Sequence, residues 1–278
     1  MPDPTILLVD NGSLEPAATL GLRAVAAALA GRVGRLVEPV SLLHSSAVPA
    51  EALDGVPAEI LEPALERRCA AGTRDFVVVP LFLGPSGALT DYLPKRLERL
   101  RARFPDLRVR IAAPVGGSVE CDPRVVDLLE ENVRRLLPAG QRPAVALVDH
   151  GSPARAVTVL RDAVAAGLHT RLGDAVRAVR PASMERRAGP DYAFADPLLG
   201  DLLDQPGFDE GTVIVAMFFL LPGRHAGPSG DVAQICAAAC QRHPGLRTLP
   251  TPVLGTLPGL VPILADRLAA VLSIPSRP

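Results

Sequence analysis

The sequence contains almost no lysine. Lys95 is the only one, so arginine carries nearly all of the positive charge. A phosphate-binding loop ending in Gly-Lys-Ser or Gly-Lys-Thr is therefore absent, and no Gly-x-Gly-x-x-Gly motif follows the first apolar segment. A large net charge is also lacking, because the formal value at pH 7 is −1. We expect no nucleotide cofactor and no basic surface that would favour a nucleic-acid partner.

Long apolar runs are missing as well. The segments TILLVD, FVVVPLFL and VIVAMFFLL are too short to cross a bilayer. The N-terminus lacks the basic region and apolar core of a signal peptide. The four cysteines, Cys69, Cys121, Cys236 and Cys240, show no disulfide framework, which favours a reducing compartment. These absences predict a soluble cytoplasmic protein without a membrane partner.

The chain repeats itself at about half its length. The segment TILLVDNGSLEPA at residues 5–17 returns as VALVDHGSPARA at 145–156, with Asn11 and His150 139 positions apart. FVVVPLFLGPSGA at 76–88 returns as VIVAMFFLLPGRHA at 213–226. Two weaker pairs, 38–43 with 180–185 and 109–117 with 246–255, keep the same order. This order of landmarks indicates a duplication.

Each half alternates short apolar segments with helical segments. The β-branched runs at 6–9, 77–79, 145–148 and 213–215 suit buried parallel strands. Helices are expected at 20–29, 59–70, 93–104, 125–137, 156–171, 232–242 and 260–272. The alternation predicts an α/β fold of two similar lobes, each a parallel sheet flanked by helices, with a cleft between them. Turn-forming residues at 137–143 place the boundary between lobes 1–138 and 143–278.

His150 and His225 are the candidate site residues. His150 directly follows a predicted strand and precedes Gly151, whereas His225 lies in LLPGRHAGP between a strand and a helix. Glu185 ends the middle strand of the same half. Ligands of parallel sheets bind beyond the carboxyl ends of the strands, so the three side chains are expected to converge at one rim. Two imidazoles and a carboxylate suit Fe²⁺, Co²⁺ or Ni²⁺, and they also suit proton transfer from a ligand.

The first half lacks all three of these residues. Asn11 stands against His150, Leu43 against Glu185, and Ala88 or Leu89 against His225. The surrounding apolar scaffold remains in both halves. A loss of three ligand types together is what a site retained in only one lobe would produce, so we assign the site to the second lobe.

At these residues the chain resembles the class II tetrapyrrole chelatases, the CbiX/SirB-like sirohydrochlorin cobaltochelatases and ferrochelatases, in a double-length form. The resemblance is carried by Val148-Asp149-His150-Gly151-Ser152, by the apolar strand leading to Pro222-Gly223-Arg224-His225, and by the acidic helix start at Asp231. Glu185 matches the glutamate that follows the family's middle strand. The motifs are intact only in residues 144–278, whereas other double-length members often keep them in the first lobe.

The resemblance implies a lyase that inserts cobalt or iron into sirohydrochlorin or a related tetrapyrrole without ATP, in cobalamin or siroheme biosynthesis. His150, His225 and Glu185 would hold the divalent metal, which is a substrate, and would accept pyrrole protons. The first lobe would form the opposite wall of the cleft. Since two fused lobes already provide that cleft, a monomer is sufficient.

Residues beside the histidines suit a flat substrate with many carboxylates. Arginine donates two parallel hydrogen bonds to a carboxylate, and glycine lets a planar ring approach the backbone. The substrate-binding candidates are Ser152, Arg155, Gly223 and Arg224, with Gly151, Arg186 and Arg187 nearby.

Other residues allow competing interpretations. Cys236, Cys240 and His243 share one helical face, but a fourth ligand is missing, so an iron–sulfur cluster or structural metal is not expected. His44 follows the position aligned with Glu185 and points to the other face of a strand, and His169 lies in a helical pattern. Ser152 is not part of a Gly-x-Ser-x-Gly nucleophile motif. The alternative function is a non-catalytic protein that binds or delivers a tetrapyrrole or a metal through the same residues.

Overall fold

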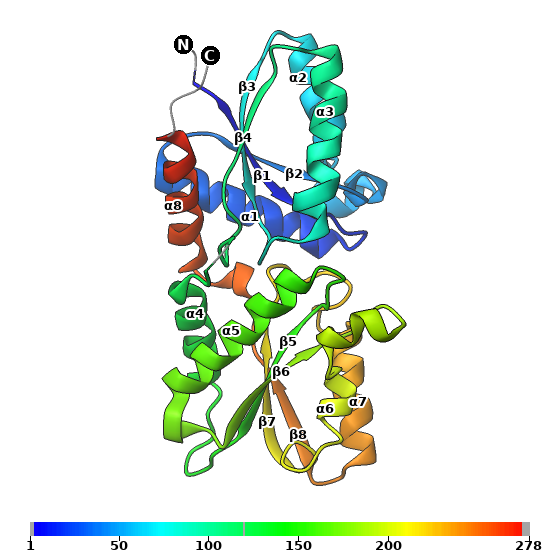
Figure 1. Ribbon diagram of the computed structural model, residues 1–278, viewed down its shortest axis with the longest axis vertical. Coiled ribbons are helices and arrows are strands. Elements are labelled where there is room, and N and C mark those ends of the chain that lie inside the picture. Colours follow the sequence, from blue (N-terminus) through cyan, green and yellow to red (C-terminus); the bar gives the residue numbers. More distant parts are fainter. Residues whose placement is uncertain (1–2, 119, 274–278) are drawn as a thin grey trace. The chain divides into compact units, whose positions relative to one another are not determined.

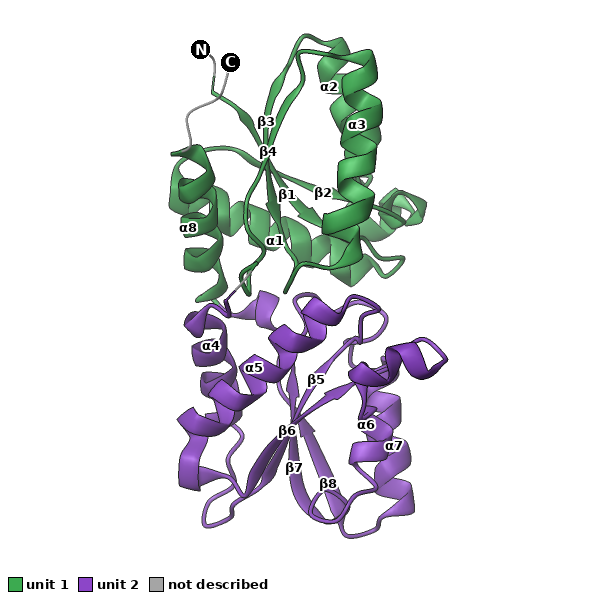
Figure 2. Cartoon of the chain, in the orientation of Figure 1, with its two compact units in different colours: residues 1–118, 258–278 green, residues 119–257 purple. Residues whose placement is uncertain are grey.

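The computed structural model describes residues 3–118 and 120–273. The chain forms two compact units, shown in Figure 2: unit 1 contains residues 1–118 and 258–278, and unit 2 contains residues 119–257. Each unit holds one four-stranded parallel sheet, and the strand orders β2-β1-β3-β4 and β6-β5-β7-β8 are equivalent. The duplication and the α/β fold with two similar lobes are thereby confirmed.

Unit 1 has its helices on both faces of the sheet (Figure 1). Its strands are β1 (Thr5–Asp10), β2 (Val37–Ser41), β3 (Asp75–Pro80) and β4 (Arg108–Ile111). Its helices are α1 (Pro16–Val33), α2 (Leu61–Ala70), α3 (Leu93–Arg103) and α8 (Leu260–Leu272). A proline at the first position of α1 suits a helix start, and Gly34 ends that helix in the left-handed conformation.

Unit 2 repeats this arrangement (Figure 1). Its strands are β5 (Ala144–Asp149), β6 (Ala178–Ser183), β7 (Gly211–Met217) and β8 (Leu246–Pro250). Its helices are α4 (Pro123–Arg134), α5 (Arg155–Leu172), α6 (Leu199–Leu202) and α7 (Asp231–Arg242). All six residues of β5 are buried, as expected for a central strand with helices on both faces.

The units do not follow the boundary that the sequence predicts at 138–143. Helix α4 precedes that boundary yet packs on α5 and β7, and the Asn132 side-chain amide donates to the Pro252 carbonyl at 3.0 Å. Helix α8 ends the chain yet packs on α1 and β3 of unit 1. Each half of the sequence thus supplies a helix to the other half's sheet. A helical pattern shows that one face will be buried, but it does not show which sheet will cover that face.

The sequence also led to expectations about disulfide bonds and membrane-spanning segments. None of the four cysteines, all of which the structure describes, forms a disulfide bond. Within residues 3–118 and 120–273, no helix is both long and apolar enough to cross a membrane.

Candidate functional site

His150 is presented by a sharp turn at the end of β5. The next residue, Gly151, has φ +88°, and a Cβ atom there would overlap the Glu185 carbonyl oxygen. The backbone N–H of Glu185 in turn donates to the His150 carbonyl at 3.2 Å. Only glycine fits this approach, which brings the segment after β6 against the residue after β5. The turn therefore places Glu185, two residues beyond β6, beside His150.

His225 is held by the beginning of α7. Its Nδ1 lies 2.5 Å from Oδ2 of Asp231, the first residue of the helix. Its carbonyl accepts from the Val232 N–H at 3.1 Å. Side chain and backbone are thus both fixed by the first turn of α7, so the loop after β7 presents the imidazole in one orientation.

The three predicted residues meet at one rim of unit 2. The Nε2 atoms of His150 and His225 are 3.2 Å apart, and His150 Nε2 is 3.3 Å from Glu185 Oε1. The ring centroids are 4.5 Å apart with the rings in an edge-to-face arrangement. The side chains stay accessible, because 48% of His150, 59% of Glu185 and 31% of His225 are exposed. A ligand larger than an ion can therefore reach all three.

The partners of the two rings determine where their protons lie. His150 Nδ1 is 2.8 Å from the Gly151 carbonyl, which can only accept, so this nitrogen carries a hydrogen. His225 Nδ1 faces the Asp231 carboxylate and carries one for the same reason. In the neutral imidazoles both Nε2 atoms then carry a lone pair, and the two atoms lie 3.2 Å apart. Both lone pairs are available to a metal ion.

The spacing of the donor atoms suits one ion. With metal–nitrogen bonds of about 2.05 Å, nitrogens at this separation subtend an angle of roughly 100° at the metal, within the range of tetrahedral or octahedral sites. In the part of the chain that the structure describes, no group of three or more His, Cys, Asp or Glu side chains is arranged so that it could hold a metal ion. The spacing that suits an ion is that of the two histidine nitrogens, whose side chains are exposed to solvent.

The substrate-binding candidates have different surroundings. The Arg155 guanidinium lies 4.4 Å from the centre of the Phe194 ring, and no carboxylate pairs with it among the described residues. Arg224 Nε lies 3.9 Å from Oδ2 of Asp231, the carboxylate oxygen that also contacts His225 Nδ1. Ser152 Oγ accepts from the Ala154 N–H at 3.1 Å and so supports the start of α5. Arg186 pairs with Asp196, Arg187 lies over the Tyr192 ring, and Gly223 belongs to the turn before Arg224.

The other histidines and the cysteine pair have separate partners. Cys236 lies in the core, where burial raises its pKa to about 11, and Cys240 Sγ is 3.6 Å from Thr248 Oγ1. His243 Nε2 contacts Asp204 Oδ1 at 2.8 Å. His44 and His169 are exposed, and Leu43, whose carbonyl meets Gly12, takes the place of Glu185 in unit 1.

Three polar residues that support the site were not among the predicted site residues. Asp231 was recognised only as a helix start, although its six-residue spacing from His225 allows the contact. Asp149 is buried behind His150, and its Oδ1 accepts from the Gly151 N–H at 3.1 Å. Arg161 is buried next to Asp149. Its position in the apolar stripe of α5, with Val164 and Leu168, is a sequence signal that could have identified it.

A cavity of about 300 Å³ occurs in unit 1. It is lined in part by Thr19, Leu22, Arg23 and Ser41, whereas the histidines belong to unit 2. The cavity and the two histidines therefore belong to different units.

Comparison with known proteins finds a similar family and similar folds. Residues 5–136 match the CbiX family model. The matched segment is the half in which Asn11 and Leu43 stand in place of His150 and Glu185. The family resemblance expected from the sequence is confirmed. A search of curated proteins finds no match.

Solved structures extend the likeness to the whole chain. SirB from Bacillus subtilis with Fe³⁺ superposes with a TM-score of 0.73 at 16% identity, over 98% of this chain and 96% of SirB. The sirohydrochlorin chelatase SirB from Bacillus subtilis subspecies spizizenii, in complex with cobalt, gives 0.69 at 18% identity, over 97% and 95%. DR2241 from Deinococcus radiodurans, a multi-domain protein similar to chelatases, gives 0.58 at 19% identity, over 96% of this chain and 54% of that protein. At these identities the comparison shows a shared fold.

Proposed function

We propose that this protein inserts a divalent metal ion, Co²⁺ or Fe²⁺, into sirohydrochlorin or a related tetrapyrrole without ATP. One observation carries the proposal: His150 Nε2 lies 3.2 Å from His225 Nε2 and 3.3 Å from Glu185 Oε1 at an accessible rim. The chelatase scaffold and the metals bound by the SirB structures support it.

Metal insertion exchanges one divalent cation for two pyrrole protons. The two Nε2 atoms bind a metal ion through their lone pairs, so any proton on either nitrogen leaves as the metal arrives from solution. When the metal passes into the macrocycle, the vacated nitrogens and the Glu185 carboxylate are the bases that accept the pyrrole protons. The hydrogen bonds of Asp231 and the Gly151 carbonyl keep both rings in the orientation that this exchange requires.

The substrate's carboxylates find donors beside the rim. Arg155 and Arg224 are the proposed partners, because Arg155 has a ring rather than an acid as its neighbour and Arg224 is 75% exposed. The Ser152 hydroxyl proton and the backbone at Gly223 are further proposed contacts. The proposal assigns the whole metal site to unit 2 and none of it to unit 1.

The test is anaerobic incubation of the purified protein with sirohydrochlorin and Co²⁺ or Fe²⁺, followed by absorbance. We expect insertion faster than in the protein-free reaction, and a loss of about 100-fold or more in kcat/KM for His150→Ala and for His225→Ala. His169→Ala, which removes an exposed histidine of α5, is the matched control and should keep the wild-type rate. Tight tetrapyrrole binding without faster insertion would instead identify a binding or delivery protein.

A further inference from the structure

Arg161 is a fully buried arginine in the middle of α5, with 1% of its surface exposed. Buried arginines are rare, because removing the guanidinium from water is costly unless its donors are paired. Here the donors are paired. Nη1 donates to Ser183 Oγ at 2.5 Å and to the Ala195 carbonyl at 3.0 Å, and Nε donates to Asp162 Oδ1 at 2.9 Å. Nη1 also lies 3.7 Å from Asp149 Oδ1.

Two of these partners directly support the site. Asp149 precedes His150, and its carboxylate accepts the Gly151 N–H of the turn that presents the imidazole. Ser183 ends β6 two residues before Glu185, and its hydroxyl also bonds to Asp149. Arg161 thus joins the ends of β5 and β6 immediately behind the two residues whose Nε2 and Oε1 atoms meet.

Unit 1 shows the same scaffold without this arginine. Helices α1 and α5 both have 18 residues and begin 139 positions apart, so Leu22 stands where Arg161 does. Asp10 occupies the place of Asp149, and its Oδ1 has no hydrogen-bond partner. Leu22 lines the cavity of about 300 Å³. The unit that lacks Arg161 is also the unit that lacks the histidines and the glutamate.

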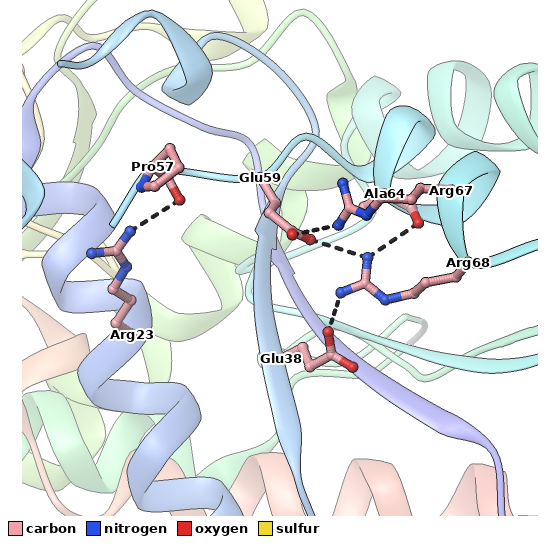
Figure 3. Close-up of polar contacts among 7 residues, drawn as sticks. All are labelled: Arg23, Glu38, Pro57, Glu59, Ala64, Arg67 and Arg68. Carbon is pink, nitrogen blue, oxygen red and sulfur yellow. Dashed lines mark hydrogen bonds and ion pairs between the residues drawn. The ribbon is translucent and has the colours of Figure 1, made fainter. Parts of the chain in front are cut away.

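An arginine that links the 18-residue helix of each unit to a later loop occurs in both units, so this link is not what distinguishes unit 2 from unit 1. In unit 1, Arg23 makes that connection: it donates to the carbonyls of Leu53 at 2.8 Å and Val56 at 2.6 Å, and to Pro57 as Figure 3 shows. In unit 2, the bond from Arg161 to Ala195 is the equivalent link. Only Arg161 adds contacts to the strand ends behind the site.

We propose that Arg161 is a positioning residue of the metal site, which fixes the separation of His150 Nε2 and Glu185 Oε1. This inference rests on one part of the proposed function, namely that His150 and Glu185 bind the metal ion. It predicts that loss of Arg161 weakens metal binding by disordering the two strand ends, beyond any effect on stability.

The test measures Co²⁺ affinity from the visible absorbance of the bound ion, together with kcat, KM and thermal stability. We expect Arg161→Met to raise the Kd for Co²⁺ by about 10- to 100-fold, the range found when groups supporting metal ligands are removed. We expect kcat to fall while the KM for the tetrapyrrole changes little, and Arg161→Lys to restore part of the affinity. Arg23→Met, the matched control in unit 1, should leave the Co²⁺ affinity unchanged.

A second variant distinguishes the positioning of the strand ends by Arg161 from its neutralisation of the buried Asp149 carboxylate. Arg161→Met leaves Asp149 buried without its cation, whereas Arg161→Leu combined with Asp149→Asn removes both charges. We expect the double variant to regain stability but to keep the weakened Co²⁺ affinity. Wild-type affinity in the double variant would overturn the proposal, as would wild-type affinity in Arg161→Met.

Nitrogen-15 spectra of the histidine rings without metal distinguish this proposal from the chelatase assignment. Because Arg161 fixes the end of β5, Arg161→Met should shift the His150 signals relative to the wild type. A shift in a protein that shows no metal insertion would refute the proposed function and retain the positioning role. Unchanged His150 signals would refute the positioning role, whether or not the protein is a chelatase.

Discussion

His225 and His243 each pair with an aspartate, but they turn different ring nitrogens toward it. Asp231 contacts Nδ1 of His225, which leaves Nε2 to face His150. Asp204 contacts Nε2 of His243, so the nitrogen at the tip of that ring is occupied. The same pair of residue types therefore leaves Nε2 facing another histidine in one place and paired with a carboxylate in the other.

This contrast predicts the effect of removing either aspartate. Asp231→Ala removes the acceptor that keeps the His225 hydrogen on Nδ1, so we expect about 10- to 100-fold weaker Co²⁺ binding. Asp204→Ala removes the partner of His243 and should leave Co²⁺ affinity unchanged. Titration of both variants with Co²⁺, followed by visible absorbance, checks the prediction. Equal affinities in the two variants would show that the Asp231 contact does not orient a ligand.

Asp10 is a buried carboxyl group without the cation that Arg161 gives to Asp149. Burial raises its pKa from 3.8 to about 6, against the opposing hydrogen bonds from Ser41 and Gly12. Because the folded-state pKa is the higher one, the folded chain binds the proton more tightly than the unfolded chain. The stability contributed by Asp10 therefore falls as the pH rises from about 4 to about 6, and is constant above about 7.

Asp10→Asn should remove this penalty. At 1.36 kcal/mol per pKa unit the cost of the ionised group is about 3 kcal/mol near pH 8 and about 1 kcal/mol near pH 4.5. We expect the free energy of unfolding of the variant, relative to the wild type, to increase by roughly 2 kcal/mol between these pH values. Urea denaturation of both proteins at each pH measures it. A difference that does not change with pH would show that the Asp10 carboxyl has the same pKa in the folded and the unfolded chain, so that its burial carries no penalty.

Elements with an uninterrupted sequence pattern were predictable. The apolar run of β5 and the helical pattern of α5 both appear where the sequence places them, and His150 follows directly from the end of that strand. The short 3₁₀ helix at Pro190–Ala195 and the four-residue α6 were not predicted, because neither is long enough to show a period. The convergence of His150, Glu185 and His225 followed from topology. The Arg161 contact to Ala195 depends on where an irregular loop lies in space, which no local pattern specifies.

The two turns at Gly12 and Gly151 provide a matched pair of substitutions. Both glycines have φ +88°, and a Cβ atom would overlap the Leu43 carbonyl in unit 1 and the Glu185 carbonyl in unit 2. Alanine at either position should cost roughly 1–3 kcal/mol of stability from the strained backbone, with the overlap adding to it. Only Gly151→Ala pushes Glu185 away from His150, so only this variant should lose Co²⁺ affinity. Chemical denaturation and Co²⁺ titration of both variants test the prediction, and equal loss of affinity in Gly12→Ala would contradict it.

At the scale of the whole molecule, the two structural units are not the two consecutive halves of the sequence. Unit 2 takes α4 from the first half of the sequence, and unit 1 takes α8 from the end of the second half. The repeat identified the two sheets, and it gave no information on which sheet each of these helices covers. A cut at the apparent midpoint of the sequence would therefore remove one helix from each unit.

This exchange predicts how fragments behave. Residues 119–257 keep α4, whose Val125, Val126, Leu129 and Val133 are buried in unit 2, together with the complete candidate site. Residues 143–278 lack that helix. At about 1.5 kcal/mol for each buried side chain, its loss removes roughly 6 kcal/mol, comparable to the stability of an entire domain. Residues 119–257 also lack α8, whose apolar face residues 143–278 would carry without α1 and β3 to cover it. We expect residues 119–257 to melt cooperatively and to bind Co²⁺ within a few-fold of the full chain, and residues 143–278 to be unfolded or aggregated.

Circular dichroism melts and Co²⁺ titration of the two fragments test this prediction. A cooperative melt and intact Co²⁺ binding in residues 143–278 would mean that α4 is dispensable and that the midpoint of the sequence is the true domain boundary.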